Sequence, residues 1–291
     1  MSSSLWRVCD AVGRVIWSLP IGELVLGVTS LDNHLYVLRV KKTSDQIEVY
    51  DIDTFHILLR LTVRGLNGPG DIVACGHNRC VYISDTIHKS VHRVALPDHT
   101  VTQWPVNDVP AGLSLTVTHG VLVTCFVFRK IMEFSTDGQL LHQLTLPEDF
   151  NSPLHSIQLS SGEFIVCHGR FSDPLHRVCL IDSDGSVVRS FSGPAGAGSQ
   201  QIDEPAHMAV DRNGFVFVVD MSNSRVLLLS PTLTNVRELV FGELDREPQS
   251  IIVRVHVDSD RRRLYIADND NMHFDDDDGT LVFGRVVVAS V

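Results

Sequence analysis

A short apolar strand that ends in a polar or thiol residue occurs six times along the chain. The segments are LYVLR (35–39), VYISD (81–85), VLVTC (121–125), EFIVC (163–167), VFVVD (216–220) and LYIAD (264–268). Their first residues stand 46, 40, 42, 53 and 48 positions apart. A period of this size, built from short strands, is typical of the blades of a β-propeller.

Each of these strands, named b, has the same neighbours: strand a before it, and strands c and d after it. All are rich in Val, Ile, Leu and Phe and end in turns with Gly or Pro, and no long stretch has the 3.6-residue period of a helix. Strand a spans 24–31, 71–76, 112–118, 155–160, 207–211 and 251–258; strand c spans 46–52, 90–96, 130–136, 176–182, 225–231 and 285–291; strand d spans 57–63, 100–106, 139–146, 186–193 and 235–242. We predict an all-β fold, a six-bladed β-propeller of four-stranded antiparallel blades.

The sixth unit reaches the end of the sequence after its strand c. The pattern of a strand d occurs instead near the beginning, in RVIWSLP (14–20). An open sheet edge favours aggregation, so we expect this segment to pair with 285–291 and close the ring. Residues 1–291 then form one domain, in which 14–20 completes the last blade together with 251–291.

The fifth unit carries a family resemblance. Residues 201–229 read QIDEPAHMAVDRNGFVFVVDMSNSRVLLL. This stretch resembles the NHL repeat at Pro205, Ala209, Val210, Asp211, Gly214, Asp220, Asn223 and Arg225. The fourth unit keeps Pro153, His155 and Gly162, and the sixth keeps Asp258 and Asp268. The resemblance implies an NHL-type six-bladed propeller, as in the C-terminal propeller of tripartite-motif proteins, where it binds RNA or protein partners. The zinc modules that confer ubiquitin-ligase activity need dense Cys and His pairs, which this sequence lacks.

Three strands b end in an aspartate, at Asp85, Asp220 and Asp268. A carboxylate at this place can accept backbone N–H groups of the following b–c turn. We therefore expect a structural role in the turn for all three residues.

The formal charge of −11, from 24 Lys+Arg and 35 Asp+Glu, argues against a nucleic-acid partner when it is taken as a sum. The four lysines nevertheless all map to b–c loops of the first four blades, on the face that those loops share with the d–a loops. This basic arc, with its neighbouring aromatic residues, predicts a partner-binding surface, and solvated loops are the simpler alternative. Its members are Lys41, Lys42, Lys89, Phe128, Arg129, Lys130, Arg170 and Phe171.

Two histidines, His155 and His207, stand at matching positions near the start of strand a in blades 4 and 5. The sequence places Ile72 and Leu113 at this position in blades 2 and 3, and Arg254 or His256 in blade 6. Two ligands are one fewer than a zinc site needs, so these histidines are weak metal candidates and we expect no metal. The run Asp275–Asp278 lacks the spacing of a calcium loop and predicts an acidic loop instead.

We expect a non-enzymatic module that binds a protein partner through the b–c and d–a loop face. One alternative is binding of single-stranded RNA on the basic arc of blades 1–4, and another is a metal-dependent lyase or hydrolase that uses the channel histidines. No nucleophile motif or phosphate-binding loop occurs, and we expect no cofactor and no small-molecule substrate. The sequence has no apolar run long enough to span a membrane and no secretory signal pattern, which predicts a cytoplasmic location without membrane contact.

Overall fold

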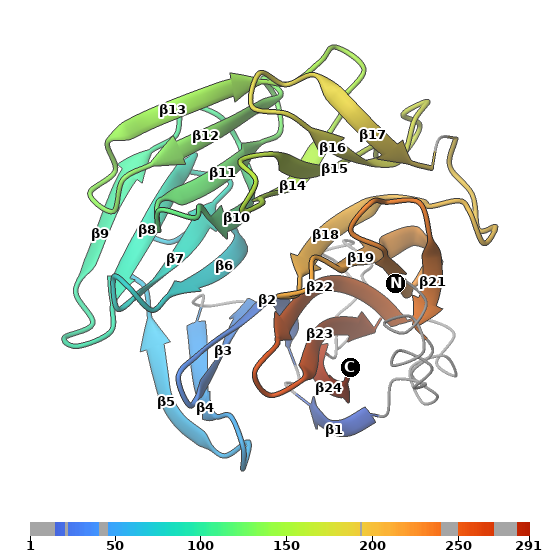
Figure 1. Cartoon of the computed structure of the whole chain (residues 1–291). Helices are drawn as coiled ribbons and strands as arrows, with labels where there is room; N and C mark the ends of the chain where they lie inside the picture. The colour runs from blue at the N-terminus through green and yellow to red at the C-terminus, as the bar shows by residue number, and fades with distance from the viewer. Residues whose placement is uncertain (1–14, 21–22, 41–45, 193, 240–249, 271–283) are drawn as a thin grey trace, which may run out of the picture.

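The computed structural model describes residues 15–20, 23–40, 46–192, 194–239, 250–270 and 284–291. These residues form six antiparallel sheets of four strands each, arranged in a ring (Figure 1); the centre of the ring, which the first strand of each blade surrounds, is called the channel below. The prediction of a six-bladed all-β propeller is confirmed. Within the described ranges, no helix combines the length and the apolar character that crossing a membrane requires.

The first three blades each run from an inner strand a to an outer strand d. Blade 1 contains β2 (Leu24–Leu31), β3 (His34–Val40), β4 (Gln46–Asp51) and β5 (Ile57–Thr62). Blade 2 contains β6 (Pro69–Cys75), β7 (Cys80–Asp85), β8 (Ser90–Ala95) and β9 (Val101–Pro105). Blade 3 contains β10 (Pro110–Leu115), β11 (Val121–Cys125), β12 (Lys130–Phe134) and β13 (Leu140–Thr145).

The remaining blades have the same order. Blade 4 contains β14 (Pro153–Gln158), β15 (Phe164–His168), β16 (Arg177–Ile181) and β17 (Val187–Phe191). Blade 5 contains β18 (Pro205–Val210), β19 (Val216–Asp220), β20 (Arg225–Leu229) and β21 (Val236–Leu239), with a one-turn 3-10 helix, Met221–Asn223, between β19 and β20. Blade 6 contains β22 (Ser250–Asp258), β23 (Arg263–Asp270), β24 (Gly284–Ser290) and β1 (Val15–Pro20).

Burial follows the position of a strand within its blade. Every residue of β7, β11, β15 and β19 is buried, because each strand b is covered by a neighbouring blade on both faces. This explains why these strands are continuous apolar runs in the sequence. The outer strands β5, β9, β13 and β17 lie at the rim in Figure 1 and bury only one residue each.

The ring is closed by the first strand, as the sequence predicts. β1 pairs antiparallel with β24, with Ser18 opposite Val287 and Leu19 opposite Val286. Inner strands of successive blades contact one another all round the channel, and β22 contacts β2. The joined ends remove the open edge that a sixth blade of three strands would leave.

Strand a begins two residues earlier than the sequence indicates in four blades. The first residue of β6, β10, β14 and β18 is a proline in each case: Pro69, Pro110, Pro153 and Pro205. Proline is tolerated at the first residue of a strand, where it need not donate to the ladder. These four prolines therefore belong to the strands and not to the preceding turns.

Candidate functional site

The b–c turn of blade 2 is held by Asp85 as expected from its position. Its Oδ1 accepts the backbone N–H of His88 at 2.8 Å. The other oxygen, Oδ2, accepts the N–H of Asn67 in the preceding d–a loop, also at 2.8 Å. One buried carboxylate thus ties together the two loops that form this corner of the loop face.

In blade 5 Asp220 contacts its turn through a side chain and not through the expected backbone N–H groups. Nδ2 of Asn223 donates to both oxygens of Asp220, at 3.0 and 2.9 Å, while the N–H of Ser224 donates to the carbonyl of Met221. Asp220 also accepts the N–H of Asp203 at 2.7 Å and the Nε–H of Arg225 at 2.6 Å. Its carboxylate therefore joins the turn and strand c to the d–a loop.

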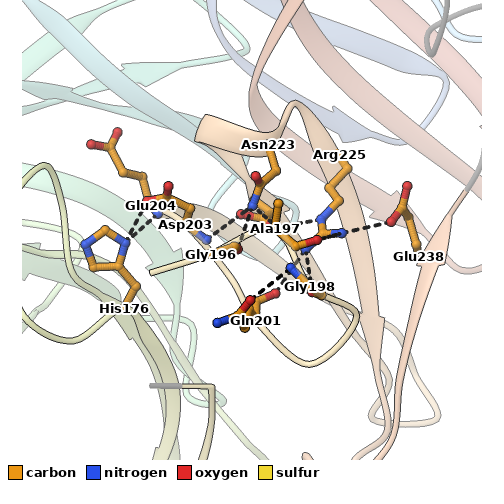
Figure 2. A network of polar contacts seen from close by, with 11 residues as sticks. His176, Gly196, Ala197, Gly198, Gln201, Asp203, Glu204, Asn223, Arg225 and Glu238 are labelled. Carbon is orange, nitrogen blue, oxygen red and sulfur yellow. Dashed lines mark hydrogen bonds and ion pairs between the residues drawn. The ribbon is translucent and has the colours of Figure 1, made fainter. Parts of the chain in front are cut away.

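Arg225 is the centre of the polar network in Figure 2. Beyond Asp220 it forms an ion pair with Glu238 at 2.9 Å, and it donates to the carbonyls of Gly198 and Gln201 at 3.2 and 3.0 Å. Asn223 adds a bond to the carbonyl of Gly196 at 3.0 Å. These contacts fix the glycine-rich connection between blades 4 and 5 against blade 5.

Asp268 of blade 6 has a comparable partner on strand c. Its Oδ2 accepts the Nε–H of Arg285 at 2.6 Å, and its Oδ1 accepts the hydroxyl of Ser250. The b–c turn that follows, including Asp275–Asp278, lies outside the described residues. The contacts that are described place Asp268, like Asp220, between strand c and the start of strand a.

Blades 3 and 4 have no aspartate at the end of strand b, and a carboxylate from another loop takes its place. In blade 3, Asp108 of the d–a loop accepts the N–H of Val127 at 3.2 Å and of Phe128 at 2.9 Å. In blade 4, Glu204, which precedes blade 5, accepts the N–H of Phe171 at 2.6 Å. The sequence pattern does not reveal either residue, because the backbone N–H groups that they accept lie 19 to 33 positions away.

Large apolar side chains are exposed on these same turns. Ile87 of blade 2 is 62% exposed, Val127 and Phe128 of blade 3 are 53% and 59% exposed, and Phe171 of blade 4 is 72% exposed. Together these four residues are called the apolar crown below. They lie on the b–c turns of three consecutive blades, on one face of the ring.

Cations stand beside the apolar crown. Lys89, Arg129 and Lys130 stand one or two positions after the exposed residues of blades 2 and 3 in the chain. In blade 4 the guanidinium of Arg170 lies over the ring of Phe171, 4.4 Å from its centroid. Lys41 and Lys42 fall outside the described residues. The structure thus brings six residues of the predicted surface, on three blades, to one face.

A second cluster lies inside the channel, at one equivalent position of each strand a. Near its start every strand a shifts register against strand b, as at a β-bulge, and the residue after the shift faces the channel. In five blades this residue is Gly27, Gly112, His155, His207 or Arg254. In blade 2 the shift spans Pro69 to Ile72, and Asp71 lies within it, two positions after Pro69, just as Gly112, His155 and His207 lie two positions after Pro110, Pro153 and Pro205. The assignment of Ile72 and Leu113 to these positions is wrong by one residue, because the sequence pattern does not show the bulge. His256 lies further along β22, where its Nε2 contacts the Ser30 hydroxyl at 2.7 Å.

Asp71 is the centre of this channel cluster. Its Oδ2 accepts the N–H of Leu113 at 2.8 Å and lies 3.4 Å from Nε2 of His207. Its Oδ1 lies 3.4 Å from Nε of Arg254, whose guanidinium also donates to the carbonyl of Gly70 at 2.7 Å. Burial opposes ionisation of Asp71, but the contacts with His207 and Arg254 outweigh it and hold the pKa of Asp71 well below its ordinary value.

The two histidines stack in the channel with ring centroids 3.9 Å apart. Burial and the neighbouring His207 lower the pKa of His155 to about 3, and burial lowers the pKa of His207 against the attraction of Asp71. Burial thus disfavours the protonated form of both imidazoles. The channel cluster brings these two rings together with the carboxylate of Asp71 and the guanidinium of Arg254.

Gly112 provides the room for His155. A Cβ at Gly112 would stand 2.4 Å from the carbonyl oxygen of Leu154 and 2.7 Å from Cδ2 of His155. Real Cβ atoms do not approach other atoms so closely. The channel cluster therefore requires glycine at position 112, because a side chain there would displace His155.

Comparison with known proteins relates the chain to others by fold. No protein-family model matches the sequence, and no curated protein matches it. A solved streptogramin B lyase superposes with a TM-score of 0.63 at 11% identity, over 94% of this chain and 97% of the lyase. A catalytically inactive variant of virginiamycin B lyase from Staphylococcus aureus with quinupristin gives the same TM-score and identity, over 93% of this chain and 99% of that one.

Two further solved structures are similar in the same way. A protein of unknown function from Bacteroides caccae has a TM-score of 0.62 at 13% identity, over 87% of this chain and 90% of that one. The β-propeller domain of Myceliophteria thermophila Cps50 (Swd1) has a TM-score of 0.58 at 9% identity, over 92% and 83%. At such identities the likeness shows the propeller fold alone.

Proposed function

We propose that this chain is a non-enzymatic interaction module that binds a protein partner through the loop face of blades 2–4. The observation that carries the proposal is the apolar crown, with four large apolar side chains exposed on consecutive turns. Contiguous exposed apolar side chains rimmed by polar residues mark interaction surfaces. The cations at Lys89, Arg129, Lys130 and Arg170 favour an acidic partner segment that carries apolar side chains.

The turns that carry the apolar crown are fixed before a partner arrives. Asp85, Asp108 and Glu204 are all buried and bind backbone N–H groups of the turns in blades 2, 3 and 4. A surface that is already ordered loses little conformational entropy on binding. This supports recognition by a preformed face rather than by a loop that folds on its partner.

A protein partner suits this face better than single-stranded RNA. RNA recognition needs flat rings for base stacking, and only Phe128 and Phe171 of the crown provide them, whereas Ile87 and Val127 do not. The formal charge of −11 also repels a phosphate backbone at long range. The test below therefore includes RNA binding as an outcome that would contradict the proposal.

The NHL-type assignment belongs to the same proposal. The residues that carry the resemblance in blade 5, Asp220, Asn223 and Arg225, contact one another in the structure. A cytoplasmic location is supported by five free, buried cysteines among the described residues, two of which, Cys75 and Cys80, are direct partners in a hairpin without being bridged. Fluorescence microscopy of the tagged full chain tests the location.

The experiment compares two triple variants of the full chain. In the test variant Ile87, Phe128 and Phe171 become Ser. In the control variant Leu58, Leu141 and Val188 become Ser; these side chains are 53%, 54% and 53% exposed on outer strands of blades 1, 3 and 4. Peptides selected from a display library on the wild-type protein are synthesised, and their affinities for all three proteins are measured by fluorescence anisotropy.

We expect acidic peptides with apolar side chains to be selected. The test variant should bind them at least about 30-fold more weakly, which corresponds to about 2 kcal/mol from the lost anchor side chains, and the control variant should bind as the wild type does. Equal weakening in both variants, or no selected peptide together with tight binding of a homopolymer RNA, would contradict the proposal.

A further inference from the structure

The channel cluster contains a set of side chains that neither the loop face nor the fold requires. Asp71, His155 and His207 come from three different blades, and one ligand atom of each lies within 4.8 Å of the others. Among the described residues this is the one group of three or more metal-ligating side chains that meets this distance. We propose that Asp71, His155 and His207 bind a divalent transition-metal ion, with Zn²⁺ as the best fit.

The distances between the ligand atoms support a tetrahedral metal. Two ligands with bonds of about 2.0–2.1 Å to zinc stand about 3.4 Å apart. Nε2 of His207 lies 3.4 Å from Oδ2 of Asp71, and Nε2 of His155 lies 3.9 Å from the same oxygen. The first distance is long for a hydrogen bond but right for two ligands of one metal. The distance from His155 is longer, so its imidazole would have to move about 0.5 Å toward Oδ2 of Asp71 for both to bind one metal ion.

Each imidazole also has a nitrogen to spare. Nε2 of His155 donates to the carbonyl of Leu113 at 3.1 Å, and that tautomer leaves Nδ1 buried without a hydrogen-bond partner in the described part of the chain. Nδ1 of His207 is buried and unpartnered in the same way. Coordination through Nε2 would place the ring proton on this unpartnered Nδ1, and in His155 the metal would replace the hydrogen bond to the carbonyl of Leu113.

The donor set indicates the class of ion. Two imidazole nitrogens and one carboxylate oxygen suit Zn²⁺, Co²⁺, Ni²⁺ or Cu²⁺ better than Ca²⁺ or Mg²⁺, which prefer oxygen ligands. Three protein ligands are one fewer than a closed structural zinc site uses, so a water molecule or another ligand from the channel would complete the set.

The positive charge of Arg254 should lower the affinity of this site for a metal ion. Its Nε lies beside Oδ1 of Asp71, the oxygen that the metal does not need, and its guanidinium is anchored on the carbonyls of Gly70 and Val253. A fixed positive charge next to a divalent cation weakens binding by Coulomb repulsion. Removal of this charge should therefore tighten metal binding, which an accidental histidine site elsewhere on the surface would not show.

The test uses the full chain without an affinity tag, stripped with a chelator and titrated with Zn²⁺ by calorimetry and with Co²⁺ by visible absorption. The wild type should bind one ion and give the visible bands of a four-coordinate Co²⁺ complex. The double variant H155Q/H207Q should lose this binding at least 100-fold. The matched control is H77Q/H119Q, which removes an exposed stacked pair of histidines with centroids 4.4 Å apart and should bind as the wild type does.

A second variant keeps the proposal falsifiable if the buried double substitution unfolds the protein. Arg254→Gln should raise the affinity for Zn²⁺ by about tenfold, and circular dichroism should confirm an intact fold. The proposal is overturned if the folded wild type takes up no ion at micromolar Zn²⁺, if H155Q/H207Q binds as the wild type does, or if a folded Arg254→Gln variant binds no more tightly than the wild type.

Discussion

The guanidinium of Arg225 donates to the buried carboxylate of Asp220 at 2.6 Å, across the turn that separates strands b and c of blade 5. The same side chain continues to the backbone of the connection from blade 4. Asp, Asn and Arg at positions 220, 223 and 225 are thus spaced so that all three meet at one point. The spacing that resembles the NHL repeat has a physical cause, since one ion pair holds a turn, a strand and an interblade loop.

Arg225→Met should destabilise the protein by about 3 kcal/mol, because it leaves Asp220 buried without its cation. Urea denaturation followed by circular dichroism measures the loss, and hydrogen exchange should show faster exchange in residues 194–201. The double variant D220N/R225M should recover part of the stability, because no uncompensated charge remains. Arg189→Met on the exposed strand β17 is the control, and a loss as large there would argue against the ion pair as the cause.

Gly112→Ala should cost at least about 2 kcal/mol, since the methyl group collides with backbone and with the ring of His155. It should also weaken the proposed zinc binding, because His155 must move. Gly76→Ala is the matched control: its Cβ would meet only the flexible end of Leu31, at 3.0 Å, and should cost little. Thermal unfolding of both variants decides between a steric effect and a general intolerance of alanine.

The free energy of unfolding should decrease as pH falls, because His168 takes up a proton more readily in the unfolded chain than in the folded one. Burial and the nearby Arg177 lower the pKa of His168 to about 4, against attraction by Asp149, and the ring stacks on Phe150. The unfolded chain binds this proton near pH 6.5 and the folded chain does not, so stability is complete above pH 6.5 and is lost as pH falls toward 4. Between pH 7.5 and 5.0 this histidine should account for about 2 kcal/mol.

The measurement is the pH dependence of unfolding in urea for the wild type and His168→Gln. Other buried histidines, among them His256 with a pKa lowered to about 4 by burial, act in the same direction in both proteins and cancel in the difference. The wild-type curve should be steeper in this range. His142→Gln on the exposed strand β13 should leave the curve unchanged; parallel curves for the wild type and His168→Gln would refute the assignment.

Asp108→Ala should release the backbone N–H groups of Val127 and Phe128 and cost about 2 kcal/mol. If the loop face binds as proposed, the variant should also bind the selected peptides more weakly, through disorder of the turn and not through loss of a contact. Hydrogen exchange at 126–129 reports the disorder directly. Asp137→Ala, in an exposed hairpin turn of the same blade, is the control.

The ring of blades could be predicted from the sequence because its signals are local. Each strand b is buried on both faces, so it appears as an uninterrupted apolar run, and the absence of a sixth strand d is visible in the order of segments. The partner of β24 follows from that absence once open edges are recognised as unfavourable.

The sequence pattern predicts only half of the channel cluster, because the register there depends on a bulge. The pattern aligns Ile72 and Leu113 with the histidines, whereas in the structure Asp71 contacts His155 and His207, and Gly112 stands at the matching position of blade 3. A signal was available: the channel residue stands two positions after the proline that begins the strand in blades 2 to 5, in PGD, PAG, PLH and PAH. No comparable sequence pattern marks Asp108 and Glu204. Each accepts backbone N–H groups of a turn far away in the sequence, so its position has no fixed spacing from that turn.

The pairing of β1 with β24 also affects the order in which the chain folds. It joins residues 15–20 to residues 284–290, so it can form only after the last blade has been synthesised. Until then blades 1 to 5 can assemble side by side while the last blade lacks its outer strand. Contacts of such sequence separation form slowly, and nascent chains with an unpaired edge are exposed to association. Ring closure therefore removes the last unpaired edge, and a chain that has not yet closed its ring is more prone to association than the folded protein.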